Sequence, residues 1–289
     1  MKVVSRIDDV RAAVRQARTE GKTVGFIPTM GYLHDGHLSL VETSKKNTGF
    51  QVMSIFVNRL QFNDKNDFTN YPKDLEHDFA MAEKCGVDLL FTPEDSEMYR
   101  NALTTVDVSL LTDNLCGAHR PGHFKGVFTV VSKLFNIVQP DLAVFGQKDI
   151  QQAVSIEKMA LDLNFPLKII LAPIIREKDG LAMSSRNKHL SAQHRADALV
   201  LSASLKRAED LILKGERNVS RITTEIESII MKGKPDRIDY ISAVRYDDLS
   251  YIDRIDGRSV IALAAFWGTT RLIDNMIISR EGDTYKCIY

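Results

Sequence analysis

Helical and strand patterns alternate from Ile7 to Leu171, and this alternation restricts the fold more than any other feature. Apolar residues recur at helical spacing over residues 7–18, and a short apolar run follows at residues 24–28. The same alternation continues with predicted helices at 37–46, 74–85, 126–138 and 150–163, and predicted strands at 52–57, 87–91, 142–145 and 167–171. Such an order is typical of an α/β fold in which a doubly wound parallel sheet carries crossover helices.

The pattern changes after about Ile175. A loop rich in small and polar residues spans 179–187, and two long helical patterns follow at 192–214 and 219–232. Strands are then predicted near 238–244, 259–265 and 270–278. This order predicts a smaller α+β domain, so we expect two domains, at residues 1–175 and 176–289.

Composition excludes several classes of protein. The 38 Lys and Arg residues balance 38 Asp and Glu, which argues against a partner such as nucleic acid that needs a strongly basic face. The longest apolar run, Val260–Trp267, is far shorter than the ~20 residues of a membrane span. With no signal-peptide pattern at the start, we expect a cytoplasmic protein without membrane partners. The three scattered cysteines predict free thiols.

Two histidines follow the predicted strand at 24–28. His34 and His37 form a His-x-Gly-His motif at the predicted start of a helix. In an open parallel sheet, ligands bind beyond the carboxyl ends of strands, and a helix start offers unpaired N–H groups to an anion. Two imidazoles three residues apart can donate to one phosphate group. We favour this phosphate site over two surface histidines of a capped helix, and over a metal site, which lacks a third ligand at the usual spacing.

A second strand end carries Lys148, Asp149 and Gln152 after the predicted strand at 142–145. These residues should face the same crevice as His34. Lys148 can neutralise phosphate charge, Asp149 can accept hydrogen bonds from ribose hydroxyls, and Gln152 can both donate and accept. The alternative is a solvated turn.

Two further loops carry cations. Arg120 and Lys125 flank glycines at a helix start, which suits a carboxylate or phosphate, although a generic basic loop has the same composition. The loop at 179–187 contains two hydroxyls and Arg186, which suit a lid over a triphosphate; a polar interdomain linker is the alternative. The sequence has no GxxxxGK[ST], GxGxxG or GxSxG motif, which argues against the commonest ATPase, dinucleotide and hydrolase classes.

Together these segments resemble the pantoate–β-alanine ligase family of the His-x-Gly-His nucleotidyltransferase-like superfamily. The resemblance covers almost the whole chain, at residues 28–37, 56–58, 61–62, 71–72, 120–124, 146–152, 179–187 and 271–275. It implies a Rossmann-like N-terminal domain that binds ATP and pantoate, a C-terminal lid domain and a homodimer formed through the N-terminal domain. The implied reaction converts pantoate and MgATP to pantoyl adenylate and pyrophosphate, and then β-alanine releases AMP and pantothenate.

The resemblance also implies roles for particular residues. His37, Lys148 and Arg186 would be catalytic. The ATP-binding set would be Met30, His34, His37, Gly146, Lys148, Asp149, Ile175, Met183, Ser184, Ser185 and Arg186. Pantoate and β-alanine would be bound by Met30, Asn58, Gln61, Arg120 and Gln152, and Asp78 would help to bind Mg²⁺.

Three positions depart from the family's pattern. Arg59 and Arg100 stand where the family usually has proline, and Cys116 stands where it usually has glutamate. We expect Arg59 to point outward, into water or toward an acidic neighbour such as Asp64 or Asp67, instead of gripping a substrate carboxylate. Two other functions stay open: another His-x-Gly-His nucleotidyltransferase, of the phosphopantetheine type, and a catalytically silent nucleotide-binding paralogue.

Overall fold

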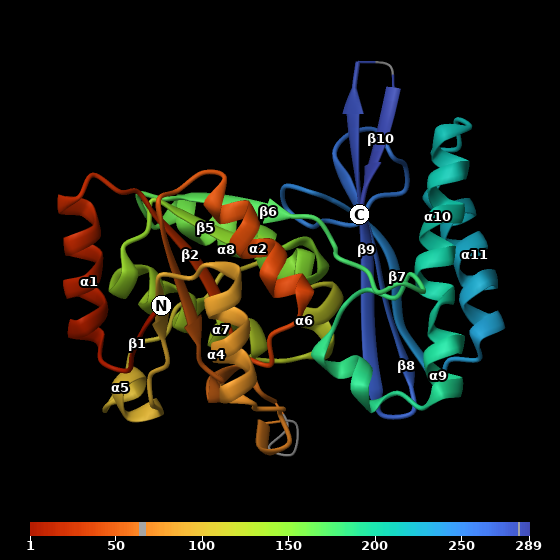
Figure 1. The fold of residues 1–289 in the computed structure, drawn as a ribbon. Helices are drawn as coiled ribbons and strands as arrows, with labels where there is room; N and C mark the ends of the chain where they lie inside the picture. Colours follow the sequence, from red (N-terminus) through yellow and green to blue (C-terminus); the bar gives the residue numbers. More distant parts are fainter. Residues whose placement is uncertain (64–67, 283) are drawn as a thin grey trace. The chain divides into compact units, whose positions relative to one another are not determined.

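The computed structural model describes residues 1–63, 68–282 and 284–289 (Figure 1). Contacts within the chain divide it into two compact units. The first unit comprises residues 1–109, 120–146 and 155–172, and the second comprises 110–119, 147–154 and 173–289. This grouping places residues 110–119 and 147–154 with the C-terminal part of the chain. The domain limits 1–175 and 176–289 therefore stay a prediction.

A six-stranded parallel sheet forms the first unit, which confirms the predicted doubly wound α/β class. Its order is β1 (Lys2–Val4), β4 (Leu89–Phe91), β3 (Phe50–Ile55), β2 (Val24–Thr29), β5 (Leu142–Gly146) and β6 (Lys168–Ala172). The chain runs outward from β2 through β3 to β4 and later returns to the other side of β2 as β5. The strand order thus reverses between β2 and β5, where parallel sheets place their ligands.

Helices cover both faces of this sheet because neighbouring residues of a strand point to opposite sides. On β2, Ile27 packs in the cluster that includes Leu40 of α2 (Asp35–Lys45) and Ala82 of α4 (Leu75–Cys85). The ring of Phe26 instead meets Phe135 of α7 (His123–Val138) edge to face, with centroids 6.5 Å apart. The other helices of this region are α1 (Ile7–Thr19), α5 (Asp95–Tyr99), α7 (His123–Val138) and α8 (Ile150–Asp162).

The second unit contains the antiparallel sheet β10-β9-β8-β7, which confirms the α+β expectation. Leu205 and Ile226 lie in one buried cluster with Leu263 and Met276 of the sheet. The unit's elements are α6 (Leu115–His119), α9 (Ala192–Ala198), α10 (Val200–Leu213), α11 (Val219–Ile230), β7 (Arg237–Arg245), β8 (Ser259–Trp267), β9 (Thr270–Glu281) and β10 (Thr284–Ile288). In Figure 1, α10 and α11 run alongside one another.

The observed elements differ from the sequence-based prediction in a few places. The predicted helix at 192–214 is two helices that meet at Leu199, whose N–H bonds to Ala196 only three residues back. β1, α5 and α6 were not predicted, since three to five residues are too few to display a period. The three cysteines are free thiols, as predicted. Among the described helices, none is long and apolar enough to cross a membrane.

One close backbone contact supports a prediction about Gly126. This glycine of α7 faces the short 3-10 helix η1 (Arg59–Gln61), and a Cβ built on it would lie 2.3 Å from the carbonyl oxygen of Leu60. Because backbone must move to admit a methyl group, Gly126→Ala should lower the free energy of unfolding by about 1–3 kcal/mol. Gly49→Ala is the matched control, since its Cβ would make only ordinary contacts with Lys22. Denaturant unfolding of both variants measures the difference, and equal stabilities would contradict the prediction.

Candidate active site

A buried carboxylate holds the turn between β2 and α2. Asp78 of α4 is 1% exposed, and its two oxygens accept the backbone N–H groups of Tyr32 at 2.8 Å and Leu33 at 2.6 Å. Gly31 begins this turn at φ +85°, where a Cβ would lie 2.8 Å from the Asp78 carboxylate. Only glycine suits both the conformation and the space. The fold of α4 therefore fixes the path of the chain into His34.

The predicted histidine pair lies together at the start of α2. His34 is the N-cap residue and His37 is the third helical residue, and their ring centroids are 4.1 Å apart. The backbone N–H of His34 donates to Nδ1 of His37 at 3.3 Å, so the proton of the neutral His37 ring lies on Nε2. The two imidazoles thus add ring donors to the N–H groups of a helix start, which is the arrangement that binds an anion.

Asp78 was predicted to help with Mg²⁺, and that role stays a prediction beside its contacts with the turn. Both of its oxygens are used by the turn. Within residues 1–63, 68–282 and 284–289, no three His, Cys, Asp or Glu side chains are grouped so that they could hold a metal ion.

Gln61 is oriented by a chain of hydrogen bonds from η1 to α5. Tyr99 donates its hydroxyl to Oδ1 of Asn58 at 2.7 Å, and Nδ2 of Asn58 donates to Oε1 of Gln61 and to the carbonyl of Gly126, both at 3.0 Å. A carbonyl can only accept, so the orientation of the Asn58 amide is fixed. The oxygen of Gln61 is then occupied, and its Nε2 points to Sδ of Met30 at 3.1 Å. Gln61 consequently presents N–H donors, which suit a carboxylate or another acceptor.

The structure adds a supporting contact to the role expected of Asn58. Its predicted place on the substrate side stays a prediction; the residue is 1% exposed and its amide nitrogen makes two hydrogen bonds. Asn58 therefore orients the side-chain amide of Gln61 through its hydrogen bond to Oε1. Tyr99, which sequence reasoning left out of the site, begins this chain, and burial together with the Asp95 carboxylate raises the pKa of its hydroxyl. Its place directly before Arg100, a position where the family usually has proline, was the available signal.

Arg120 acts on the backbone of Gln61 through His123. The ring of His123 donates from Nδ1 to the carbonyl of Gln61 at 2.7 Å, so its Nε2 is the acceptor in the neutral form. Nη1 of Arg120 lies 3.1 Å from this Nε2. His123, at the start of α7, was also absent from the predicted site residues, although it follows Arg120 in the same matched segment. Main-chain and side-chain contacts together fix Gln61.

Arg59 points outward, as predicted. Its Nε donates to both oxygens of Asp95, at 2.8 and 3.0 Å, and its side chain is 49% exposed. The guanidinium also lies 5.3 Å from the centre of the Tyr99 ring. The suggested partners, Asp64 and Asp67, lie outside the described residues.

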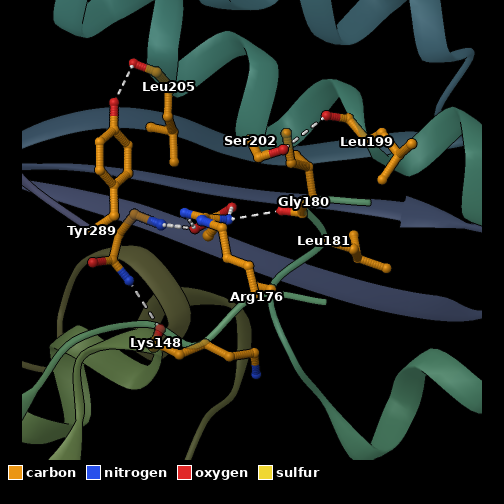
Figure 2. A network of polar contacts seen from close by, with 12 residues as sticks. Lys148, Arg176, Gly180, Leu181, Leu199, Ser202, Leu205 and Tyr289 are labelled. Carbon is orange, nitrogen blue, oxygen red and sulfur yellow. Dashed lines mark hydrogen bonds and ion pairs between the residues drawn. The ribbon is translucent and has the colours of Figure 1, made fainter. Parts of the chain in front are cut away.

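In the second unit, Lys148 and Asp149 lie in the 3-10 turn η2 (Gln147–Asp149), which follows Gly146 of β5 in sequence. Nδ2 of Asn275 donates to the carbonyl of Lys148 at 3.0 Å. Figure 2 shows Lys148 held by this carbonyl while its side chain extends away from the contact. Asp149 is exposed and Gln152 of α8 is half-buried.

The loop predicted as a lid begins as a tight hairpin. The N–H of Met183 donates to the carbonyl of Ile175 at 2.9 Å, which brings these two predicted ATP-binding residues together. Arg176 pairs with Asp274 of β9 through two hydrogen bonds, of 2.7 and 3.0 Å, and also donates to the carbonyl of Gly180 (Figure 2). Asp274 is 2% exposed; burial raises the pKa of its carboxyl, and the Arg176 guanidinium opposes that shift.

The remaining predicted residues follow the hairpin. Ser184 caps the 3-10 helix η3 (Ser185–His189), since its hydroxyl accepts the N–H of Arg186 at 3.2 Å. Ser184, Ser185 and Arg186 are all half-buried. Asn187 anchors the end of the segment through its amide, which donates to Glu177 at 2.6 Å.

The first unit therefore defines a class: a doubly wound α/β protein with a paired-histidine turn after β2 and an oriented amide donor after β3. Comparisons with known proteins give the family. Residues 2–277 match the family model described as pantoate-beta-alanine ligase. The chain belongs to the pantoate-beta-alanine ligase family, and its relatives are ligases.

Relatives and solved structures agree with this assignment. The chain is 53% identical over 278 residues to a pantothenate synthetase of Thermoanaerobacter sp. (strain X514), which covers 96% of this chain and 98% of the relative. A crystal structure of pantothenate synthetase from Thermus thermophilus matches with a TM-score of 0.90 and 42% identity, over 95% of this chain and 98% of that one. The structure of pantoate-beta-alanine ligase from Francisella tularensis, complexed with beta-gamma ATP and beta-alanine, matches with a TM-score of 0.78 and 33% identity, over 96% and 97% of the two chains.

The orientation of Gln61 leads to a prediction for Tyr99→Phe. This change removes the hydroxyl that donates to Oδ1 of Asn58. The same oxygen still accepts the backbone N–H of Leu60 at 3.3 Å. With a net worth of about 0.5–1.5 kcal/mol for that bond, the kcat/KM for pantoate in a coupled assay should fall about two- to tenfold while the KM for ATP stays the same. Tyr251→Phe, at a tyrosine that is 59% exposed, is the control. An unchanged kcat/KM would contradict the proposed support of Gln61.

Arg59→Pro should leave substrate binding almost unchanged. Asn58 has φ −78° and ψ 106°, which suits a residue before proline, and Arg59 opens η1, where a fixed φ is tolerated. Proline restricts the unfolded chain, which should raise the free energy of unfolding by about 0.4–1 kcal/mol. This gain should offset the ~0.2–1 kcal/mol lost with the exposed ion pair. We expect the KM for pantoate to stay within about twofold. Asp95→Ala separates the ion pair from the proline effect, and a tenfold rise in KM for Arg59→Pro alone would show that the arginine grips substrate.

Proposed function

We propose that this chain condenses pantoate with β-alanine at the expense of ATP, through a pantoyl adenylate, and releases AMP and pyrophosphate. The observation that carries the proposal is the first strand-end turn, where paired imidazoles at a helix start lie a few residues from Met30, which contacts the amide donor of Gln61. Such donors suit a phosphate and a hydroxy acid. Membership of the family and the names of the relatives support the same reaction.

In the first step, a carboxylate oxygen of pantoate attacks the α-phosphorus of ATP. A P–O bond forms, the bond to the β,γ-phosphates breaks, and pyrophosphate leaves. Such a transfer needs positioning and neutralisation of charge more than a side-chain nucleophile. We assign His34 and His37 to the phosphates, with Gln61 and Gln152 holding pantoate and Met30 beside them. Arg120 would act on this substrate side through its contact with His123.

In the second unit, we assign Lys148, Ser184, Ser185 and Arg186 to the phosphates and Asp149 to the ribose. Gly146, Ile175 and Met183 would complete the ATP-binding set. His37, Lys148 and Arg186 are proposed to stabilise the charge that develops as pyrophosphate departs. Mg²⁺ would enter as part of the MgATP substrate, and Asp78, which also holds the turn after β2, would help to bind it.

In the second step, the amine of β-alanine attacks the acyl carbon of the adenylate. A C–N bond forms, the C–O bond to AMP breaks, and the amine loses a proton. The oriented amide of Gln61 would keep the pantoyl group in place between the two steps. A cytoplasmic homodimer formed through the N-terminal domain is also part of the proposal, and light scattering at the mass of a dimer would support it.

The reaction is tested by incubating the protein with ATP, magnesium, pantoate and β-alanine and measuring AMP and pantothenate. AMP formation that requires both organic substrates is the expected result. Turnover of ATP with phosphopantetheine, in the absence of pantoate and β-alanine, would indicate another nucleotidyltransferase. Binding of ATP without turnover would indicate a catalytically silent protein.

The phosphate assignment leads to a prediction for Lys148→Ala. Removing the positive charge assigned to the phosphates should lower pantoate-dependent exchange of labelled pyrophosphate into ATP by about 10²-fold or more. This loss corresponds to about 3 kcal/mol of transition-state stabilisation. Lys158→Ala, at an exposed lysine of α8 that pairs with Asp162, is the matched control and should leave exchange unchanged. Full activity of Lys148→Ala would remove this lysine from the mechanism.

A further inference from the structure

The dipeptide Asp274–Asn275 of β9 belongs to a matched segment, residues 271–275, for which the reaction above supplies no role. Asn275 is 1% exposed. Its Nδ2 donates to the carbonyls of Gln147 and Lys148, both at 3.0 Å, and its Oδ1 accepts from Nε2 of Gln147 at 3.3 Å. One side chain therefore binds two consecutive carbonyls of the turn that carries Lys148.

The chemistry of these contacts requires an amide. Two carbonyl oxygens need two donors on one atom, and the same side chain must accept from Gln147. Aspartate at position 275 would place a carboxylate against two carbonyls, and alanine would leave both of them without these donors. The turn then loses the contacts that set the direction of the Lys148 side chain (Figure 2).

Asp274, the neighbour of Asn275, holds the hairpin at 175–183, which leads into the second segment that we assign to the phosphates. The carboxylate of Asp274 receives both terminal nitrogens of Arg176, at 2.7 and 3.0 Å, and the backbone N–H of Asn275 at 2.8 Å. Arg176 in turn donates to the carbonyl of Gly180, at the tip of the hairpin that leads to Ser184. Charge-assisted, two-pronged pairs of this kind fix orientation as well as distance.

We propose that Asp274 and Asn275 form a positioning pair, which sets Lys148 and the hairpin at 175–183 in one fixed geometry for a nucleoside triphosphate. The inference rests on the proposed function of Lys148. Neither residue contacts the ligand; each acts through a neighbour, and together they determine the separation of two cationic segments before ATP arrives. Such preorganisation affects the stabilisation of the transition state more than it affects the affinity for pantoate.

A double-mutant cycle distinguishes this role from a general contribution to folding. In the full-length protein, Asn275→Ala should lower the kcat of pantoate-dependent pyrophosphate exchange at least tenfold and raise the KM for ATP, with the KM for pantoate unchanged. In a Lys148→Ala background, the same change should lower exchange by less than about twofold, because the group that it positions is absent. Asn275→Asp should lose as much as Asn275→Ala, since it cannot donate.

Trp267→Phe is the matched control. It removes one buried hydrogen bond, from Nε1 of this residue of β8 to the carbonyl of Gly233 at 2.7 Å, and should lower thermal stability without changing the exchange kinetics. Multiplicative effects of Asn275→Ala and Lys148→Ala, or equal exchange by Asn275→Ala and wild type, would overturn the inference. If Asn275→Ala does not fold, Asn275→Ser, which keeps one donor, is measured in the same cycle.

Titration calorimetry with ATP separates this inference from the proposed function. If the wild-type protein binds ATP but shows no pantoate-dependent exchange, this result contradicts the proposed reaction but not the positioning role. The positioning role would then be supported by weaker ATP binding of Asn275→Ala and overturned by unchanged binding.

Discussion

The first unit depends on one constraint: its six strands are parallel, and their order reverses beside β2. All strands of such a sheet end at the same edge, so the segments that follow β2 and β3 must lie near one another. The turn after β2 carries the histidine pair, and the segment after β3 carries Asn58 and Gln61. The contact between Gln61 and Met30 is the direct result of this topology.

The supports around these turns are mostly amides and backbone groups. Asn58 and Asn275 each donate to two oxygens, at least one of them a main-chain carbonyl, and Gln151 does the same for the carbonyls of Leu111 and Asn114. A buried amide satisfies backbone carbonyls without the desolvation penalty of a charge. Where charge is buried, as in Asp78 and Asp274, donors surround both oxygens. The loops are consequently determined by side chains distant in sequence.

Much of the fold could be predicted from the sequence, because the long elements have clear periods. The helices at 7–19 and 75–85 and the strands β2, β3 and β5 lie close to their predicted limits. His34 and His37 were found because their four-residue motif lies within about one helical turn. Supports such as Tyr99 and His123 were missed as site residues, since their roles depend on contacts 41 and 62 residues away in sequence. Local patterns do not record which distant side chain meets a turn.

The chain of hydrogen bonds behind Gln61 also determines how this part of the protein responds to acid and base. Asn58 and Gln61 do not titrate, and burial raises the pKa of Tyr99 further above its already high ordinary value. The amide of Gln61 therefore keeps its orientation through the physiological pH range. His123 donates from its ring Nδ1 to the main-chain carbonyl of Gln61, so the backbone of Gln61 has a support separate from the amide contacts of its side chain.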